Sequence, residues 1–500
     1  MLDRYEAEKI ERLAYLCRRL EGGPQGAERS RFASALFGRT AAEDLVGYDV
    51  DDLIAFVEHA WTHLQERPRG TARVRLIDHP LNAARETGRT ITAVEIVNDD
   101  MPFLLDSTMG ELGERGLDIR LVAHPILALE RDAEGRLLRF DGLADAATPG
   151  AARESFITFH LARVLTSEER EGLIAGLEAT LADVADAVAD WQPMRARIVA
   201  AAEEWRANRP PVDEATLGEA EAFVDWLADD NFTFLGLREY DYHAVPGDEA
   251  LQRRDDSGLG ILRNPDVRVL RRGKELVTLT PEVREFLQRP DPLIITKANV
   301  RSRVHRRTHM DYVGLKRFAP GGELVGELRL VGLFTHGAYT RSVRTIPVVR
   351  RKVDAVLSRH GFDPASHSGK ALLNILESYP RDELFQIEVD TLAAFAREIL
   401  ELGERPRVRV LARRDKFDRF VSVLVYVPRE RAATDVEARI GDHLATAYDG
   451  WVAASNLAFP EGRLARLHII VGRSGGATPE VDRDVVEAGV AGIVRTWADA

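Results

Sequence analysis

The chain has 500 residues, a formal net charge of −13 and a hydrophobic content of 45%. This length suggests roughly three to four domains, and the hydrophobic content is typical of a soluble protein with buried cores. The acidic balance argues against a nucleic-acid binder, because such proteins present a basic surface to phosphates. The single cysteine, Cys17, excludes an internal disulfide framework and a cysteine-rich zinc site.

Targeting signals are not apparent. The first residues interleave acidic and basic side chains and lack the apolar core of a signal peptide. No stretch of 18 consecutive apolar residues occurs, so no membrane span is expected. Low cysteine use fits a reducing compartment. We therefore expect a cytoplasmic protein that binds neither membrane nor nucleic acid.

Residues 1–80 are expected to form an N-terminal helical region. Apolar residues recur there at helical spacing, in the two sets Ile10, Leu13, Leu16, Leu20 and Leu53, Phe56, Val57, Trp61, Leu64.

Residues 90–191 change to a mixed pattern, with the order β-α-β-β-α and an extra hairpin arm. The β-rich run 92–97 precedes Asn98-Asp99-Asp100, which we interpret as a helix cap. A capping box at Thr166 and Glu169 predicts the start of the last helix.

The rest of the chain alternates helical and strand-rich segments. Residues 192–228 are predicted to be a helical linker, 229–360 a strand-rich module, and 361–404 a second helical motif. Residues 405–500 return to the order β-α-β-β-α, with a capping box at Thr434 and Glu437, which indicates a weak internal repeat. No helix stop signal precedes the last residue, so we expect a truncated segment. The predicted fold class is α+β and multidomain.

Nucleotide-binding motifs are incomplete. A dinucleotide fold needs G-x-G-x-x-G after a strand, but Gly258-Leu259-Gly260 is followed by Arg263 at the third glycine position. Residues 366–370 look like the end of a phosphate-binding loop, yet Ala371 replaces the magnesium-binding hydroxyl. We interpret Ser366 or Ser368 as a helix cap. No catalytic or cofactor-binding residue is therefore expected in this chain.

Two further motifs also have ordinary interpretations. Residues 472–476 match G-x-S-x-G, but no histidine follows Ser474, so a hydrolase is rejected in favour of a flexible loop. His305 and His309 have the spacing of a metal-binding pair on a helix, but the flanking strands argue against a helix, and no metal site is expected.

A basic cluster stands out in this acidic chain, formed by Lys297, Arg301, Arg303, His305, Arg306, Arg307 and His309. Two interpretations remain. One is pairing with acidic neighbours or subunits, which we favour. The other is an anionic effector site at Arg301 and Arg303, because guanidinium groups bind carboxylates and phosphates in a fixed geometry.

Several longer runs resemble the long-chain bacterial NAD-specific glutamate dehydrogenases. The runs are Glu95–Leu104, Asn231–Gly236, Lys297–Ser302, Met310–Phe318, Val331–Thr335, Tyr339–Ser342 and His367–Phe385. They occur in the family's order between about residues 90 and 475. The resemblance covers most of this chain but only about the first third of a family member.

The resemblance implies a homotetramer whose amino-terminal part contains ACT-like and PAS-like modules joined by helical motifs, with the NAD-binding catalytic domain further along. It assigns residues 90–191 and 405–500 to ACT-like domains and 229–360 to a PAS-like module. By analogy with ACT domains, Asn98, Asp99, Asp100 and Met101 are candidate contacts for an amino-acid effector. The alternative for these four is plain helix capping, which we favour.

The predicted function is the regulatory and oligomerisation segment of an enzyme that converts glutamate, NAD and water to 2-oxoglutarate, ammonia and NADH. NAD would bind outside this segment, which would hold no cofactor itself. The alternative is a stand-alone amino-acid-sensing or scaffold protein with ACT-like domains.

Overall fold

The computed structural model describes residues 4–81, 90–144, 152–245, 248–267, 277–278, 289–416, 419–473 and 477–495. Ser474 and the chain end lie outside these ranges. The chain divides into two compact units, and the dividing point falls within one long helix, α6 (Ser167–Ala207). The first unit comprises residues 1–191, 259–263 and 300–309, and the second comprises 192–258, 264–299 and 310–500.

The first unit begins with the predicted helical region, which contains α1 (Arg4–Glu21), α2 (Gly26–Phe37), α3 (Ala42–Val46) and α4 (Val50–Leu64). The expectation of helix up to residue 80 is wrong, because Arg73–Pro80 form strand β1. Apolar and charged residues alternate at Arg73, Val74, Arg75 and Leu76, which is a strand period.

The remaining elements of this unit follow the predicted order β-α-β-β-α, and β4 with β5 forms the predicted hairpin arm. They are β2 (Thr90–Asp99), α5 (Leu104–Glu114), β3 (Ile119–Ala123), β4 (Ile126–Arg131), β5 (Leu137–Leu143), β6 (Ala152–Leu161) and the first part of α6. The strand order is β1-β2-β6-β4-β5, with β3 also paired to β6. The capping box is confirmed, since Glu169 N donates to Thr166 Oγ1 at 3.3 Å and Thr166 N donates to Glu169 Oε2 at 2.8 Å.

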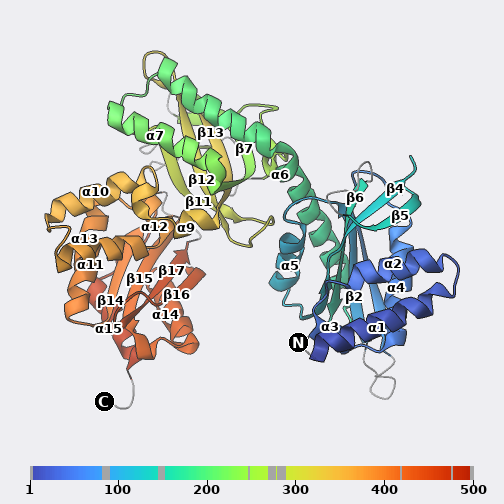
Figure 1. Ribbon diagram of the computed structural model, residues 1–500. Helices are drawn as coiled ribbons and strands as arrows, with labels where there is room; N and C mark the ends of the chain where they lie inside the picture. The colour runs from blue at the N-terminus through green and yellow to red at the C-terminus, as the bar shows by residue number, and fades with distance from the viewer. Residues whose placement is uncertain are drawn as a thin grey trace. The chain divides into compact units, whose positions relative to one another are not determined.

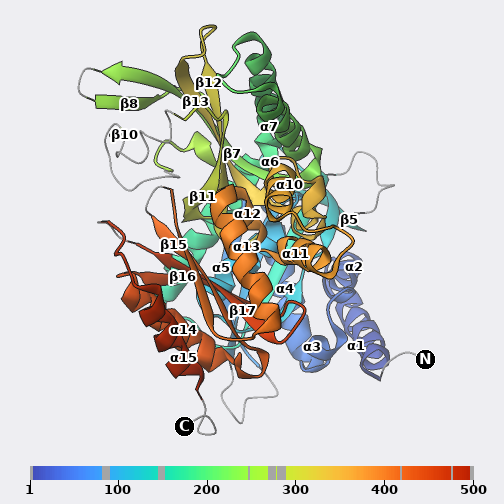
Figure 2. The same ribbon diagram turned by 90° about the vertical axis from the view of Figure 1, so that its left-hand side faces the viewer.

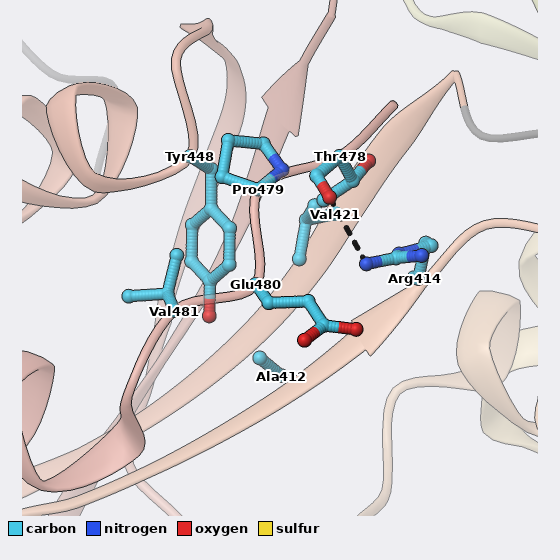
Figure 3. A pocket seen from close by; sticks show the side chains of 8 residues that line it. All are labelled: Ala412, Arg414, Val421, Tyr448, Thr478, Pro479, Glu480 and Val481. Atoms are coloured by element: carbon cyan, nitrogen blue, oxygen red, sulfur yellow. Dashed lines mark hydrogen bonds between the residues drawn. The ribbon is translucent and has the colours of Figure 1, made fainter. Parts of the chain in front are cut away.

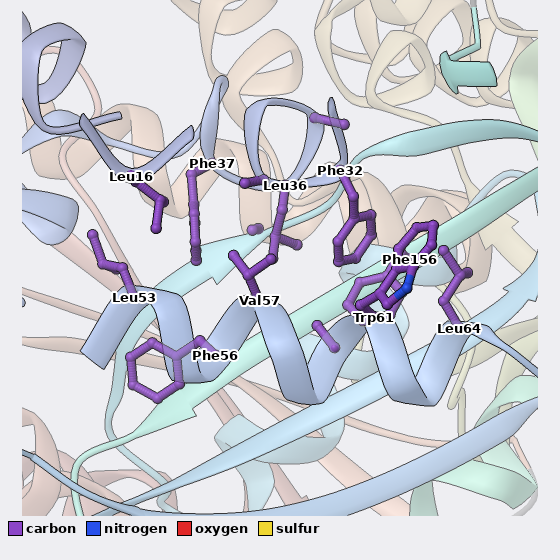
Figure 4. Close-up of a cluster of buried hydrophobic side chains, with 14 of the residues drawn as sticks. Leu16, Phe32, Leu36, Phe37, Leu53, Phe56, Val57, Trp61, Leu64 and Phe156 are labelled. Atoms are coloured by element: carbon purple, nitrogen blue, oxygen red, sulfur yellow. The ribbon is translucent and has the colours of Figure 1, made fainter. Parts of the chain in front are cut away.

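Helices α1 to α4 share a hydrophobic core with one face of this sheet, whereas α5 and α6 lie on the other face (Figure 1). In that core the Phe32 ring lies 5.5 Å from Trp61 and 5.5 Å from Phe156, centroid to centroid (Figure 4). Fully buried aromatic side chains contribute strongly to stability because each removes a large apolar area from water. The N-terminal helices and the sheet therefore form one body.

The second unit starts with the end of α6, then α7 (Glu214–Trp226) and a π-turn (Leu227–Asn231), before a strand-rich module. Its strands are β7 (Phe232–Val245), β8 (Asp248–Arg253), β10 (Val277–Thr278), β11 (Leu293–Arg301), β12 (His309–Phe318) and β13 (Leu324–Phe334), in the order β10-β8-β7-β13-β12-β11. Trp205 of α6 is buried against this sheet and donates its indole N–H to Lys316 O at 2.7 Å.

A helical motif follows. It contains α9 (His336–Thr340), α10 (Val349–His360), α11 (His367–Ser378), α12 (Arg381–Gln386) and α13 (Val389–Glu404). Ser366 caps α11, because its hydroxyl accepts the Gly369 N–H at 3.1 Å. A Cβ atom at Gly369 would lie 2.1 Å from Asp363 O. The run 366–370 is thus a tightly packed helix start and not a phosphate cradle.

The last sheet is built from β14 (Arg409–Arg414), β15 (Phe420–Pro428), β16 (Trp451–Ala458) and β17 (Leu464–Gly472), in the order β14-β15-β17-β16. Helices α14 (Thr434–Ala447) and α15 (Arg483–Val494) cover its apolar face, and α11 to α13 lie on the other (Figure 2). The prediction of a capping box at Thr434 and Glu437 is wrong, because the N-cap residue of α14 is Ala433 and no side chain caps this helix.

The internal repeat expected from the sequence appears as a shared topology. The path β1-β2-β6-β3 in the first unit has the same order as β14-β15-β17-β16 in the second. In both, the second strand is followed by a helix and then by the strand at the end of this path, and a helix follows the last strand in sequence. We call these the first and second repeats. Within the described residues, no helix is long and apolar enough to cross a membrane.

Candidate functional sites

The turn after β2 holds the first set of predicted effector contacts, Asn98 to Met101. Their favoured interpretation as a helix cap is wrong, because α5 begins at Leu104 and its N-cap is Phe103, which has φ 72° and no side-chain cap. Asn98 is buried, and its amide donates to Asp99 O at 3.1 Å. Met101 is partly buried. The turn is therefore shaped by the left-handed Phe103 backbone, which is uncommon outside glycine.

Asp99 belongs to a charge network that extends into the interior. Arg67 Nη2 lies 2.6 Å from Asp99 Oδ1 and 2.7 Å from Glu154 Oε1, and Arg131 binds both oxygens of Glu154 at 2.7 and 2.8 Å. Burial disfavours the charged form of Glu154, but the two guanidinium groups overcome it and hold the pKa below its ordinary value. Asp99 is the solvent-facing end of this network, with its side chain 46% exposed.

Asp100 and a neighbouring histidine complete the turn. Arg153 Nε lies 3.2 Å from Asp100 Oδ2, and His124 Nε2 lies 2.5 Å from Ser155 Oγ. Burial lowers the pKa of His124, and the charge of Asp100 opposes this only in part. Both carboxylates of the turn thus already face an arginine of the same unit.

The basic cluster is paired with acidic side chains. In the second unit, Lys297 Nζ lies 2.6 Å from Asp311 and 3.2 Å from Asp382. In the first unit the ion pairs are Arg301–Glu114 at 3.7 Å, Arg303–Asp183 at 3.4 Å, His305–Asp106 at 3.1 Å and Arg307–Glu111 at 2.7 Å. These contacts are those that the favoured interpretation predicts. Arg301 and Arg303 remain about half exposed, which leaves their guanidinium groups accessible to solvent.

The predicted effector residues do not meet at one site. Asn98 to Met101 lie in the turn before α5, whereas Arg301 pairs with Glu114 of α5 and Arg303 pairs with Asp183 of α6. The His305 ring packs on the Phe103 ring, with centroids 5.2 Å apart. The backbone N–H of His305 donates to Ser107 Oγ at 2.8 Å, so both contacts lie at the start of α5. Both rings come from residues with positive φ. Arg301 instead pairs with Glu114 in the last turn. His305 and His309 do not share a helix, and no cluster of metal-binding side chains occurs in the described ranges.

The glycine pair at residues 258–260 also has an internal partner. In the first unit, Gly260 N donates to Asp190 Oδ2 at 2.7 Å, and Arg263 binds both oxygens of Asp190 at 2.5 and 2.6 Å. The anion held by this turn is therefore a side chain of the protein. This agrees with the interpretation that it is not a dinucleotide site.

A pocket in the second repeat was missed by sequence reasoning (Figure 3). Its volume is about 400 Å³, and it is lined by Ala412, Arg414, Val421, Tyr448, Thr478, Pro479, Glu480 and Val481. These residues come from β14, β15, the end of α14 and the segment before α15. No local pattern joins four segments that are separated in the sequence, so only the fold brings them together.

Comparisons with known proteins match three family models: the ACT1 domain of glutamate dehydrogenase over residues 32–177, its helical motif 1 over 346–405, and its ACT2 domain over 409–498. Relatives named NAD-specific glutamate dehydrogenase include proteins of Halomonas elongata, 35% identical over 99% of this chain, and Pseudomonas aeruginosa, 31% identical over 94%. A Mycobacterium tuberculosis relative of the same name is 27% identical over 81%. The chain spans 31%, 29% and 24% of their respective lengths.

Proposed function

Because this chain belongs to the family of large NAD-specific glutamate dehydrogenases, we propose that it is the regulatory and oligomerisation segment of such an enzyme. The observation that carries the proposal is the share of each relative's length that this chain covers. The Halomonas elongata and Pseudomonas aeruginosa relatives match nearly all of this chain. This chain, however, spans less than a third of the length of either relative. The parent enzyme oxidises glutamate with NAD and releases 2-oxoglutarate, ammonia and NADH.

The folds of both repeats support a role other than hydride transfer. A dinucleotide-binding fold uses a parallel sheet with a glycine-rich turn after its first strand. The strand pairs of the first and second repeats are antiparallel, and the sequence lacks that glycine pattern. NAD then binds to the part of the enzyme outside this segment, and the catalytic residues lie there as well.

Regulation and assembly are the roles that we assign to the segment. Asn98, Asp99, Asp100 and Met101 remain the candidate contacts for an amino-acid effector, and Arg301 and Arg303 for an anionic one. The strand-rich module at 229–360 is proposed to be PAS-like, the full enzyme to be a cytoplasmic homotetramer in amino-acid catabolism, and effector binding to be coupled allosterically to the active site.

A turnover assay tests whether catalysis takes place outside this segment. The purified 500-residue protein should produce no NADH from glutamate and NAD. A longer protein that also contains the NAD-binding catalytic domain should produce it. Saturable NADH production by the segment alone would refute the proposal. Sedimentation velocity of the segment should show self-association, and a strictly monomeric segment would remove the assembly role.

Calorimetry distinguishes the two interpretations of the basic cluster. The double substitution Arg301→Ala, Arg303→Ala leaves the binding of small anions unchanged if these arginines only pair with Glu114 and Asp183. It abolishes that binding if they form an effector site. A stand-alone sensor, the alternative function, requires that the natural reading frame does not continue into a nucleotide-binding domain.

A further inference from the structure

The loop that connects β11 to β12, residues 302–308, belongs to the first unit, whereas most of both strands belongs to the second. Ser302 and Val304 of this loop are buried, and Ser302 N donates to Thr308 O at 2.8 Å. A connection between two strands usually runs over the surface and is mobile. This loop is instead bound to α5 and α6, and two of its side chains make most of the contacts.

Arg307 binds both helices. Its Nη2 atom lies 2.7 Å from Glu111 Oε2 and 3.1 Å from Thr180 Oγ1, and the side chains of Arg307 and Glu111 are largely buried. The aliphatic part of Arg307 crosses α5 at Gly110, where a Cβ atom would lie 2.9 Å from Arg307 Cγ. The helix therefore accommodates this arginine because residue 110 has no side chain.

His305 joins the loop to the start of α5. Its backbone N–H donates to Ser107 Oγ at 2.8 Å, and its Nδ1 lies 3.1 Å from Asp106 Oδ2. Its ring packs on Phe103, which follows the turn that contains Asn98–Met101. Phe103 and His305 have φ values of 72° and 64°. Such backbone conformations are unfavourable outside glycine and persist only where surrounding contacts hold them. The ring contact thus connects two segments that each depend on their neighbours.

We infer that residues 302–308 form a latch, which is docked on α5 and is released when the turn before α5 changes its conformation. The docked state requires the present backbone of Phe103, because that backbone places the Phe103 ring against His305. A ligand or a substitution that moves Phe103 removes this contact and weakens the docking of the whole loop. The change then passes along the chain to the adjoining ends of β11 and β12, residues 300–301 and 309–310.

The latch deepens the proposed regulatory function, on which it rests. It gives the turn at Asn98–Met101 a means of altering two strands that lie about 200 residues further along the chain. The docked and released loops are the two states that such a coupling requires.

Hydrogen exchange of the 302–308 amides in the 500-residue protein measures how often the latch opens. Gly110→Ala displaces Arg307 from α5 without removing a charge or a hydrogen-bonding group. We expect exchange to become about fivefold faster or more, the lower end of the usual effect of overpacking. The matched control is Gly113→Ala in the same helix, where nothing lies within 4 Å of the Cβ position. Both substitutions favour helix, so α5 stays folded in each variant.

A substitution outside the loop tests the coupling to the turn. Phe103→Ala removes the ring that packs on His305, and we expect the 302–308 amides to exchange about twofold to tenfold faster, the usual effect of losing an aromatic pair. Phe103 is only partly buried, so the variant should fold. Leu138→Ala is the control, because it removes an exposed apolar side chain from β5 of the same unit. It should leave the loop unchanged.

Three results would overturn the inference. The loop of Gly110→Ala exchanges like that of Gly113→Ala, the loop of Phe103→Ala exchanges like that of the wild type, or the loop opens without faster exchange at the adjoining ends of β11 and β12. Each of these results leaves the proposed function intact. Failure of the proposed function has a different readout, since it appears as NADH production or as a strictly monomeric segment.

Discussion

Arg413 and Glu383 form a doubly hydrogen-bonded ion pair beneath the sheet of the second repeat. Arg413 Nε and Nη2 lie 2.7 and 2.8 Å from the two carboxylate oxygens, and both side chains are buried. Burial disfavours the charged form of Glu383, yet Arg413 holds its pKa below the ordinary value. The pair joins β14 to α12, on the face of the sheet opposite the apolar core that α14 and α15 cover.

We expect Glu383→Ala to lower the free energy of unfolding by about 3–5 kcal/mol, because it leaves the Arg413 charge buried without a partner. Adding Arg413→Met should restore part of that loss, since the second change removes the stranded charge. Urea denaturation of the two single variants and the double variant measures the coupling. Strictly additive losses would show that the two side chains do not act as a pair.

The pH dependence of the first unit should follow three buried histidines. Burial is the main cause that lowers the pKa of His63 to about 3, of His79 to about 4 and of His160 to about 3. Further positive charge comes from Arg75 beside His63 and from neighbouring histidines beside the other two. Phe56 packs against two of them, with ring centroids 4.5 Å from His79 and 4.2 Å from His160.

In the unfolded chain these histidines take up protons near pH 6.5, whereas in the fold they stay neutral. Their contribution to stability is therefore complete above pH 6.5 and falls as the pH drops towards 4. The loss is about 1.4 kcal/mol per pH unit for each histidine. Hydrogen exchange of α4 amides at pH 7.5, 6 and 5 measures it. Exposed His336→Gln should not alter the slope, and His160→Gln should reduce it. Equal protection at pH 7.5 and 5 would contradict this account.

The two carboxylates that contact Arg67 should differ in their effect on stability. Glu154→Gln should cost about 3 kcal/mol or more, since it removes the charge that compensates two buried guanidinium groups. Asp99→Asn should cost under about 1 kcal/mol, because exposed ion pairs are screened by water. Thermal unfolding of both variants provides the comparison. Equal losses would mean that Asp99 is as firmly built into the network as Glu154.

Gly369 should not tolerate a side chain. A Cβ atom there would meet the Asp363 carbonyl, so Gly369→Ala should destabilise the helical motif by about 1–3 kcal/mol. Gly218 in α7 is the control, since nothing lies within 4 Å of its Cβ position. Gly218→Ala should stabilise the protein by up to about 1 kcal/mol. Denaturant melts of the two variants should shift in opposite directions, and a neutral Gly369→Ala would disprove the close contact.

Local pattern predicted a large part of the fold. The period of apolar residues indicated α1, α4 and the two β-α-β-β-α orders, because an amphipathic face is encoded within a few consecutive residues. The caps at Ser366 and Thr166 were predicted for the same reason. Two edge strands, β1 and β14, were not predicted. An edge strand gains its neighbour only in the folded sheet, and its own sequence is short and rich in arginine.

The sequence by itself determined most of the element types, the family and the lack of a dinucleotide-binding motif, since each is encoded in contiguous residues. Tertiary structure decided which charges meet. Whether Asp99 faces Arg67, whether Arg303 faces Asp183, and whether Arg413 faces Glu383 all depend on segments that approach one another only after folding. Ion pairs and pockets are short-range contacts, so the positions of distant backbone segments decide them, and periodicity carries no information about those positions.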